Sequence, residues 1–254
     1  MRRVVFNQKG GVGKSTIACN LAAIGAARGR RTLLIDLDAQ ANASRYVLGT
    51  ALEQQEKTLA HFFDDLLGYK LFPETLASYV VRTPFAGLDV LPSDPRLEEL
   101  QFKLESRYKM YKLRESLDQL PGYDDVFIDT PPALNFFTRS ALIAADSCLI
   151  PFDCDDFSRR ALYTLMDSVR EIRSDHNREL RVEGIVVNNY QARARLPARL
   201  VEELRGEGMP ILDAFLSASI KIRESHHQAL PMIHLDPRHK LTDEFSALYD
   251  LLAH

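Results

Sequence analysis

A glycine-rich decapeptide near the amino terminus constrains the fold of this chain more than any other segment. Residues 7–16 read Asn-Gln-Lys-Gly-Gly-Val-Gly-Lys-Ser-Thr, directly after the apolar residues 4–6. Downstream, Ile17, Leu21 and Ile24 share one face of an expected helix. A strand, a glycine-rich turn and a helix in this order are typical of a loop that binds phosphate through backbone N–H groups and the helix N-terminus. We therefore expect phosphate groups to bind at Gly10, Gly11, Val12, Gly13, Lys14, Ser15 and Thr16.

Two side chains of this loop have the chemistry that a nucleoside triphosphate requires. Lys14 can reach the β- and γ-phosphates, and the Ser15 hydroxyl can bind magnesium. The loop also departs from the plain phosphate-loop pattern, because Gln8 stands in the place of its first glycine and a second lysine, Lys9, stands at its entrance. The alternative is an ordinary glycine-rich turn with two surface lysines, which the flanking strand and helix disfavour.

Apolar β-rich runs alternate with helical patterns along the rest of the chain. Strands are expected at residues 31–36, 87–91, 123–129, 147–151 and 182–188, with a weaker one at 211–213. Helices are expected between them, for example at residues 157–174 and 238–251, and the basic stretch 103–114 is interpreted as an exposed helix. This alternation predicts an α/β fold with a doubly wound, mostly parallel sheet and helices on both faces. Ligands of such sheets bind at the carboxyl ends of the strands.

Acidic side chains stand at two of those strand ends. Asp36 and Asp38 follow the second strand, and Asp129 follows the three apolar residues 126–128 after an interval of nearly a hundred residues. Carboxylates beside a phosphate loop suit magnesium binding and the positioning of water. An acid pair in a strand-to-turn connection is the alternative for Asp36 and Asp38, since aspartate is common in turns. Asp129 alone is a weak motif, but it gains weight from the loop at residues 9–16.

The bulk composition excludes several classes of protein. The chain has 254 residues, of which 46% are hydrophobic, so a large core is expected. No apolar run reaches the ~18 residues of a membrane span, and the early first strand predicts no signal peptide. Cys19, Cys148 and Cys154 lack metal-ligand spacing, so reduced thiols in a cytoplasmic protein are expected. Because the net charge is −3, nucleic-acid binding would need a local basic patch.

These motifs together resemble the deviant Walker A ATPases, the ParA/MinD family, over nearly the whole chain. The resemblance implies a P-loop NTPase fold in one domain spanning residues 1–254, with ATP and Mg²⁺ as cofactors and a homodimer in the ATP state. It implies that Lys9 reaches the ATP of the other subunit, that Asp38 orients the attacking water, and that Ser15, Asp36 and Asp129 serve the metal. The Thr130-Pro131-Pro132 segment resembles a switch that senses the γ-phosphate, and Asn188, or nearly as well Asn189, is expected to contact the adenine.

The biological role of such an ATPase is less constrained than its chemistry, because members of this clan use the same ATPase fold for several functions. The first interpretation is a ParA-like switch that binds nucleoid DNA non-specifically, is stimulated by a ParB-like or other partner protein, and segregates or positions a plasmid, chromosome or protein cargo. The expected DNA-binding residues are Arg193, Arg195, Lys221 and Arg223, for which a solvated basic face is the alternative. A MinD-like membrane switch is disfavoured by the acidic residues 244–254. A metabolic ATP-dependent ligase of the same clan is the third interpretation.

The late histidines, His226, His227, His234 and His239, are not expected to form a metal site.

Overall fold

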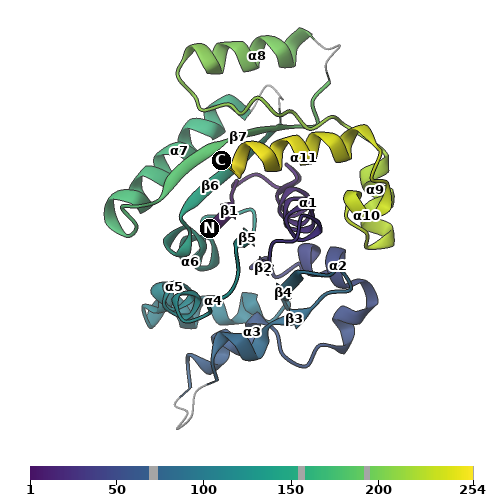
Figure 1. Ribbon diagram of the computed structural model, residues 1–254. Coiled ribbons are helices and arrows are strands. Elements are labelled where there is room, and N and C mark those ends of the chain that lie inside the picture. Colours follow the sequence, from purple (N-terminus) through teal and green to yellow (C-terminus); the bar gives the residue numbers. More distant parts are fainter. Residues whose placement is uncertain (69–73, 154–157, 192–194, 254) are drawn as a thin grey trace.

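A seven-stranded sheet forms the centre of the computed structural model, which describes residues 1–68, 74–153, 158–191 and 195–253 (Figure 1). The strand order is β3-β4-β2-β5-β1-β6-β7. The strands are β1 (Arg2–Val5), β2 (Thr32–Asp36), β3 (Val81–Arg82), β4 (Leu88–Leu91), β5 (Asp125–Asp129), β6 (Ser147–Asp153) and β7 (Arg181–Asn188). All neighbouring strands pair in parallel except β3 and β4. The predicted doubly wound, mostly parallel α/β fold is therefore confirmed.

Helices cover both faces of this sheet (Figure 1). They are α1 (Lys14–Ala27), α2 (Asn42–Leu48), α3 (Leu59–Asp65), α4 (Leu97–Ser106), α5 (Lys112–Asp118), α6 (Phe136–Ala144), α7 (Ser158–Asp175), α8 (Arg195–Gly206), α9 (Lys221–Gln228), α10 (Met232–Leu235) and α11 (Lys240–Leu252). Short 3₁₀ turns lie at Gly49–Gln54, Leu76–Tyr79 and Lys109–Tyr111. Among the described residues, none of the helices has both the length and the hydrophobicity needed to cross a lipid bilayer.

The alternation of side chains along each central strand divides the core into two clusters. In β1, Val4 packs with α3 to α7 on one face, whereas Val5 packs with α1, α2, α10 and α11 on the other. In β5, Ile128 and Phe127 divide between the faces in the same way. Side chains at successive strand positions point to opposite faces, so a strand that is covered on both sides must be apolar throughout. That requirement explains the continuous apolar runs of the sequence.

Two local predictions are wrong and one short strand was missed, and each case has a physical reason. Residues 211–213 do not form a strand, because Ile211 makes only an isolated bridge to Ile185 beside the end of the sheet. Residues 103–114 are not one helix, because Tyr108 adopts a left-handed backbone conformation, φ 55°, between α4 and α5. Strand β3 was not predicted, because its two residues, which pair antiparallel to β4, are too few to give a periodic pattern.

Cys19 and Cys148 are buried free thiols, and Cys154 lies outside the described residues.

A buried ion cluster lies at the start of the central strand β5. Arg3 donates to Asp125 at 3.1 Å and to Glu183 at 3.1 Å, and both the Arg3 and the Asp125 side chains are 4% exposed. Tyr249 of α11 donates to the same Asp125 carboxylate at 2.6 Å, and Arg30 also contacts it. Burial alone would raise the pKa of Asp125, but the hydrogen bonds from Arg30 and Tyr249 and the charge of Arg3 hold that pKa below its usual value. Asp125 thus joins β1, β5 and α11.

We expect Asp125→Asn to lower the free energy of unfolding by about 3 kcal/mol at pH 7, because the buried Arg3 charge loses a counter-charge. Urea denaturation measures the difference. Because folding lowers the pKa of Asp125, its stabilisation is present above the unfolded carboxyl pKa of about 4 and is lost as the pH falls. The deficit should therefore shrink at acid pH. Asp118→Asn is the control, since its pair with Arg2 is exposed and worth less than about 1 kcal/mol. Equal effects of the two variants would contradict the buried-cluster interpretation.

Candidate functional site

The glycine-rich loop lies between the carboxyl end of β1 and the start of α1, as its sequence predicts. Gly11 and Gly13 have φ values of 76° and 89°, which L side chains rarely adopt. Gly13 also lies so close to β7 that an added Cβ atom would stand 2.3 Å from Nδ2 of Asn188. The position therefore requires glycine both for its backbone conformation and for its contact with β7.

Two asparagines attach this loop to neighbouring strand ends. Asn7 donates to the carbonyl of Pro151 in β6 at 2.7 Å, and its Oδ1 accepts a hydrogen bond from the Lys9 N–H at 2.9 Å. Asn188, at the end of β7, donates to the carbonyl of Val12 at 3.0 Å. Asn188 was predicted as an adenine contact, and that role stays a prediction, since here its amide holds the loop. Asn7 was not predicted as a site residue, although its position between the strand and the glycines was a usable signal.

A cavity of about 400 Å³ opens over the loop. This volume is within the range of small-molecule sites. Its wall combines the loop with residues from the ends of other strands and from α9. The lining residues are Gly10, Gly11, Gly13, Lys14, Ser15, Thr16, Asp38, Gln40, Asn42, Pro132 and His226. Gln40, Asn42 and His226 were not predicted as site residues, because only the fold brings them to the loop. Another cavity of comparable size, at the opposite edge of the sheet around Arg2 and Asp146, lacks a phosphate-binding loop.

Lys14 is buried in the lining of the cavity over the loop, which we call the nucleotide cavity because the sequence predicts a nucleotide here. Its Nζ atom donates to the carbonyl of Lys9 at 3.0 Å, so the first residue of α1 folds back over the loop that precedes it. Burial lowers the pKa of Lys14, and the nearby carboxylates of Asp129 and Asp38 oppose this effect. A phosphate oxygen at this position would replace a neutral carbonyl with a charged acceptor, which makes the stronger hydrogen bond to an ammonium group.

Asp36 and Asp129 stand side by side at the ends of β2 and β5, where they are register partners. Asp36 is satisfied within the protein, because it accepts hydrogen bonds from both the N–H and the hydroxyl of Ser44 at 2.7 Å. Burial raises its pKa to about 6, although the Ser44 hydrogen bonds counteract the rise. Asp129 differs, since neither carboxylate oxygen has a hydrogen-bond partner among the described residues. Burial, and next the Asp36 charge, raise the pKa of Asp129 well above its usual range, and the Ser15 hydroxyl nearby offsets part of this.

The arrangement around Asp129 fits magnesium. A buried polar atom without a partner is uncommon and calls for a ligand or ion. Asp129, Asp36 and the Ser15 hydroxyl offer the hard oxygen atoms that magnesium prefers. Across the described ranges, no three acidic, histidine or cysteine side chains form a complete metal site by themselves. Magnesium does not need one, because it usually keeps several waters and takes phosphate oxygens as further ligands.

Asp38 lines both the nucleotide cavity and a second cavity of about 380 Å³. Its carboxylate accepts a hydrogen bond from the Gln40 N–H at 3.0 Å, and the residue is 8% exposed. The second cavity is bounded by Pro131, Pro132 and Asn135 after β5 and by Glu98 of α4. Asp38 is therefore the acid of the three that borders open space on two sides. That position suits the orientation of a water molecule better than it suits the binding of a phosphate.

Comparison with known proteins decides the family. A family model described as an AAA domain matches residues 3–182. The chromosome partitioning protein ParA of Caulobacter vibrioides is 34% identical over 237 residues, which cover 91% of this chain and 86% of that protein. The chain belongs to the ParA family of partition ATPases.

Solved structures share the fold over nearly the whole chain. The McdA–ATP complex of Cyanothece has a TM-score of 0.85 at 21% identity and covers 99% of this chain and 96% of that one. Cobyrinic acid a,c-diamide synthase of Mycobacterium smegmatis, with a bound ATP analogue and magnesium, also has a TM-score of 0.85, at 23% identity and with coverage of 99% and 93%. Because a diamide synthase shares this fold, whereas the Caulobacter relative is a chromosome partitioning protein, the fold alone does not assign a purpose to this chain.

The expected DNA-binding residues of this ParA-family chain are only partly placed. Arg193 lies outside the described residues, and Arg195 begins α8 with an undescribed side chain. Lys221 and Arg223 are both in the first turn of α9. Lys221 pairs with Glu224 at 2.8 Å, whereas Arg223 is exposed and has no ion pair among the described residues.

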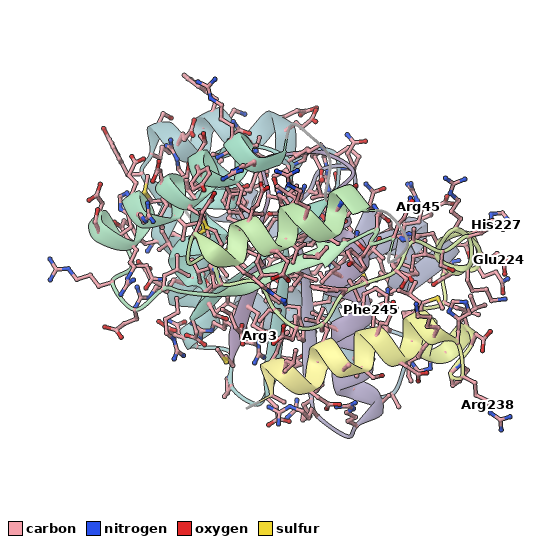
Figure 2. The ribbon with its side chains drawn as sticks, turned by 90° about the horizontal axis from the view of Figure 1, so that it is seen from above. Arg3, Arg45, Glu224, His227, Arg238 and Phe245 are labelled. Carbon is pink, nitrogen blue, oxygen red and sulfur yellow. The ribbon has the colours of Figure 1, made fainter. Side chains whose placement is uncertain are left out.

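Further basic residues lie near α9. Figure 2 shows Arg45 of α2, His227 of α9 and Arg238 at the same end of the molecule. Arg45 and Arg238 are exposed, and neither has an ion pair within the part of the chain that the structure describes. By contrast, Arg199 and Arg205 of α8 pair with Glu203 and Asp213, respectively. We call Arg45, Arg223 and Arg238 the α9 surface.

Proposed function

We propose that this ParA-family protein is an ATP-dependent dimerising switch. The observation that carries the proposal is the nucleotide cavity, which is lined by the glycine-rich loop, Lys14 and Asp38, with the unpartnered carboxylate of Asp129 buried close enough to act on the charge of Lys14. In the proposed cycle, ATP binding forms a homodimer, the dimer binds nucleoid DNA without sequence preference, and an activating partner protein of the ParB type triggers hydrolysis. Such a cycle would segregate or position a plasmid, chromosome or protein cargo in the cytoplasm. It needs no contact with a membrane.

The residues around the cavity would hold ATP and Mg²⁺ in complementary ways. The loop from Gly10 to Thr16 offers backbone N–H groups to the phosphates at the N-terminus of α1, and Lys14 adds a positive charge for the β- and γ-phosphates. Ser15, Asp36 and Asp129 would hold magnesium, directly or through water. Bound magnesium supplies positive charge that offsets the charge developing on the phosphate oxygens. The McdA–ATP complex and the diamide synthase with its bound ATP analogue and magnesium support ATP as the nucleotide.

The proposed hydrolysis uses two further residues of this chain. Asp38 would orient the attacking water from its place between the two cavities. We assign to Lys9 the role of reaching the nucleotide of the other subunit, since it stands at the loop entrance with its backbone fixed by Asn7 and Lys14. Positioning and electrostatic stabilisation are the main sources of catalysis in phosphoryl transfer, so these roles are sufficient for a slow basal ATPase.

The α9 surface is the proposed site of DNA binding. Arginines without an acidic partner can release the counterions of phosphate groups, whereas paired arginines would first have to give up their carboxylates. Contacts from arginine to phosphate carry no sequence information, so this surface would bind the DNA backbone independently of sequence. A homodimer would present this surface twice, which explains why DNA binding should require ATP.

We expect Arg223→Ala to weaken ATP-dependent DNA binding about equally for all sequences. The salt slope should also fall by about one for every phosphate that the missing guanidinium no longer neutralises in each subunit. Fluorescence anisotropy with unrelated duplexes, over a range of salt concentrations and with ATP, ADP or no nucleotide, measures both effects. The control is Arg170→Ala on α7, whose arginine is also exposed but pairs with Asp167 at 2.8 Å.

Two outcomes would redirect the proposal. If the wild-type protein dimerises with ATP but has no DNA affinity at low salt, a soluble partner or a MinD-like membrane target becomes the better function, and binding to anionic vesicles would separate these two. If ATP turnover instead depends on a carboxylate substrate and produces an amide, the protein is a ligase of the same clan. The M. smegmatis synthase is the structural neighbour that motivates this last comparison.

A further inference from the structure

His226 of α9 lies in the nucleotide cavity, although it belongs to none of the phosphate-binding motifs. Its Nε2 atom is 2.9 Å from the hydroxyl of Thr16, the last residue of the glycine-rich loop. One face of the imidazole stacks on the ring of Tyr46, with 4.0 Å between ring centroids and 18° between planes. The residue is nevertheless exposed, because it borders the cavity. A ring held on one face and open on another can meet an incoming ligand.

The position of this ring is set by a buried polar network, which does not depend on the imidazole itself. Ser225, the neighbour of His226, contacts the Tyr46 hydroxyl and donates to the carbonyl of Leu230. Asn20 of α1 donates to the Tyr46 hydroxyl at 3.1 Å and to the Thr16 carbonyl at 2.8 Å. The network therefore connects α9 to the helix that begins at the phosphate loop. Changes at His226 alone should leave this attachment intact.

We propose that His226 is a nucleotide-binding residue, which donates a hydrogen bond from Nε2 to a phosphate oxygen at the Thr16 end of the loop. The inference rests on the proposed nucleotide binding of this cavity. In a phosphate-binding loop, the lysine at the position of Lys14 contacts the β- and γ-phosphates, and the hydroxyl at the position of Ser15 binds the metal. The loop amides surround the α- and β-phosphates. A group beside Thr16 is therefore expected to contact a phosphate that ATP and ADP share. The imidazole replaces its present hydroxyl partner with a charged acceptor, which strengthens the hydrogen bond.

Two substitutions separate the hydrogen bond of His226 from its packing. His226→Phe keeps an aromatic ring on Tyr46 and removes the donor, whereas His226→Gln keeps a donor and removes the ring. We expect His226→Phe to weaken ATP and ADP binding by the same factor, roughly tenfold to a hundredfold, as for one hydrogen bond to a charged group. His226→Gln should recover part of that affinity. Isothermal titration calorimetry with each nucleotide and magnesium measures the affinities.

His227→Phe is the matched control, because His227 is the next residue of the same helix, is exposed and does not line the cavity. Thermal unfolding without nucleotide shows whether each variant is folded. If His226→Phe is folded and binds ATP and ADP as the wild type does, the inference is wrong. An affinity decrease confined to ATP, or an equal decrease in His227→Phe, would also overturn it. If the wild type itself binds neither nucleotide, the proposed function fails instead, so the two failures are distinguishable.

Discussion

Lys14→Ala should abolish ATP binding, with an affinity decrease of at least about a hundredfold. The wild-type ammonium is the cation nearest to the expected β- and γ-phosphates, and electrostatic groups of this kind contribute most in sites that exclude water. Its present acceptor, the Lys9 carbonyl at 3.0 Å, shows that the side chain already points along the loop. Isothermal titration calorimetry measures the affinity, and analytical ultracentrifugation with ATP should find the variant monomeric.

The fold should tolerate this substitution. Burial lowers the pKa of Lys14, which means that the protein interior does not favour its charged form. Removing the Lys14 side chain mainly deprives Asp129 and Asp38 of a nearby positive charge. The unfolding temperature without nucleotide should therefore change little, whereas the rise that ATP causes should disappear. Lys112→Ala, at an exposed lysine paired with Glu115, is the control. An unchanged ATP affinity in a folded Lys14→Ala protein would refute the assignment of the cavity.

Asp38→Ala should retain ATP binding but reduce hydrolysis by about a hundredfold to ten-thousandfold, the range expected when an acid–base or water-positioning group is removed. Asp38 lines both cavities but makes none of the loop's expected phosphate interactions. The ATP dimer should therefore persist, and if the proposed switch is correct, its residence on DNA should lengthen. Single-turnover phosphate release and the ATP dissociation constant, measured on the same preparation, test both parts.

Asp36→Ala provides the contrast that makes the Asp38 experiment specific. Asp36 is fully buried and accepts two hydrogen bonds from Ser44, so its removal should lower stability as well as metal-dependent ATP binding. If Asp38→Ala loses ATP affinity while its residual turnover per bound ATP stays normal, the roles of the two acids have been exchanged. Normal turnover with normal affinity would remove Asp38 from the mechanism altogether.

The sequence predicts those parts of the site that local chemistry specifies. The glycines of the loop and the acids at the ends of β2 and β5 can be identified because each follows an apolar strand. Parallel strands bring their carboxyl ends to the same side of the sheet, so these residues are expected to lie together. Ser44 and His226 could not be predicted in this way. Ser44 reaches Asp36 because α2 packs back over β2, and His226 reaches Thr16 because α9 packs against α2, although 210 positions separate them. Such contacts depend on tertiary packing, which leaves no spacing in the sequence.

The errors in the fold have a similar origin. The two-residue β3 exists because β4 offers it an open edge, and the break at Tyr108 depends on a backbone angle that tyrosine seldom adopts. The failed strand at residues 211–213 has the composition of a strand, but beyond its isolated bridge to β7 it does not form a continuous ladder. In each case the neighbouring element, rather than the residue's own preference, decides the conformation.

The central place of β1 has a consequence for biosynthesis. Of the described strands, β1 is the earliest in the chain, yet its partners are β5 and β6. Arg2 therefore cannot pair until Val126 has been synthesised, and Arg3 cannot pair with β6 until Ser147 has been synthesised. The loop anchors at Pro151 and Asn188 leave the ribosome later still. A nascent chain therefore carries its glycine-rich motif long before that motif has a defined shape, because pairings between distant segments form late. We therefore expect nucleotide capture to be postponed until Asn188 has been synthesised.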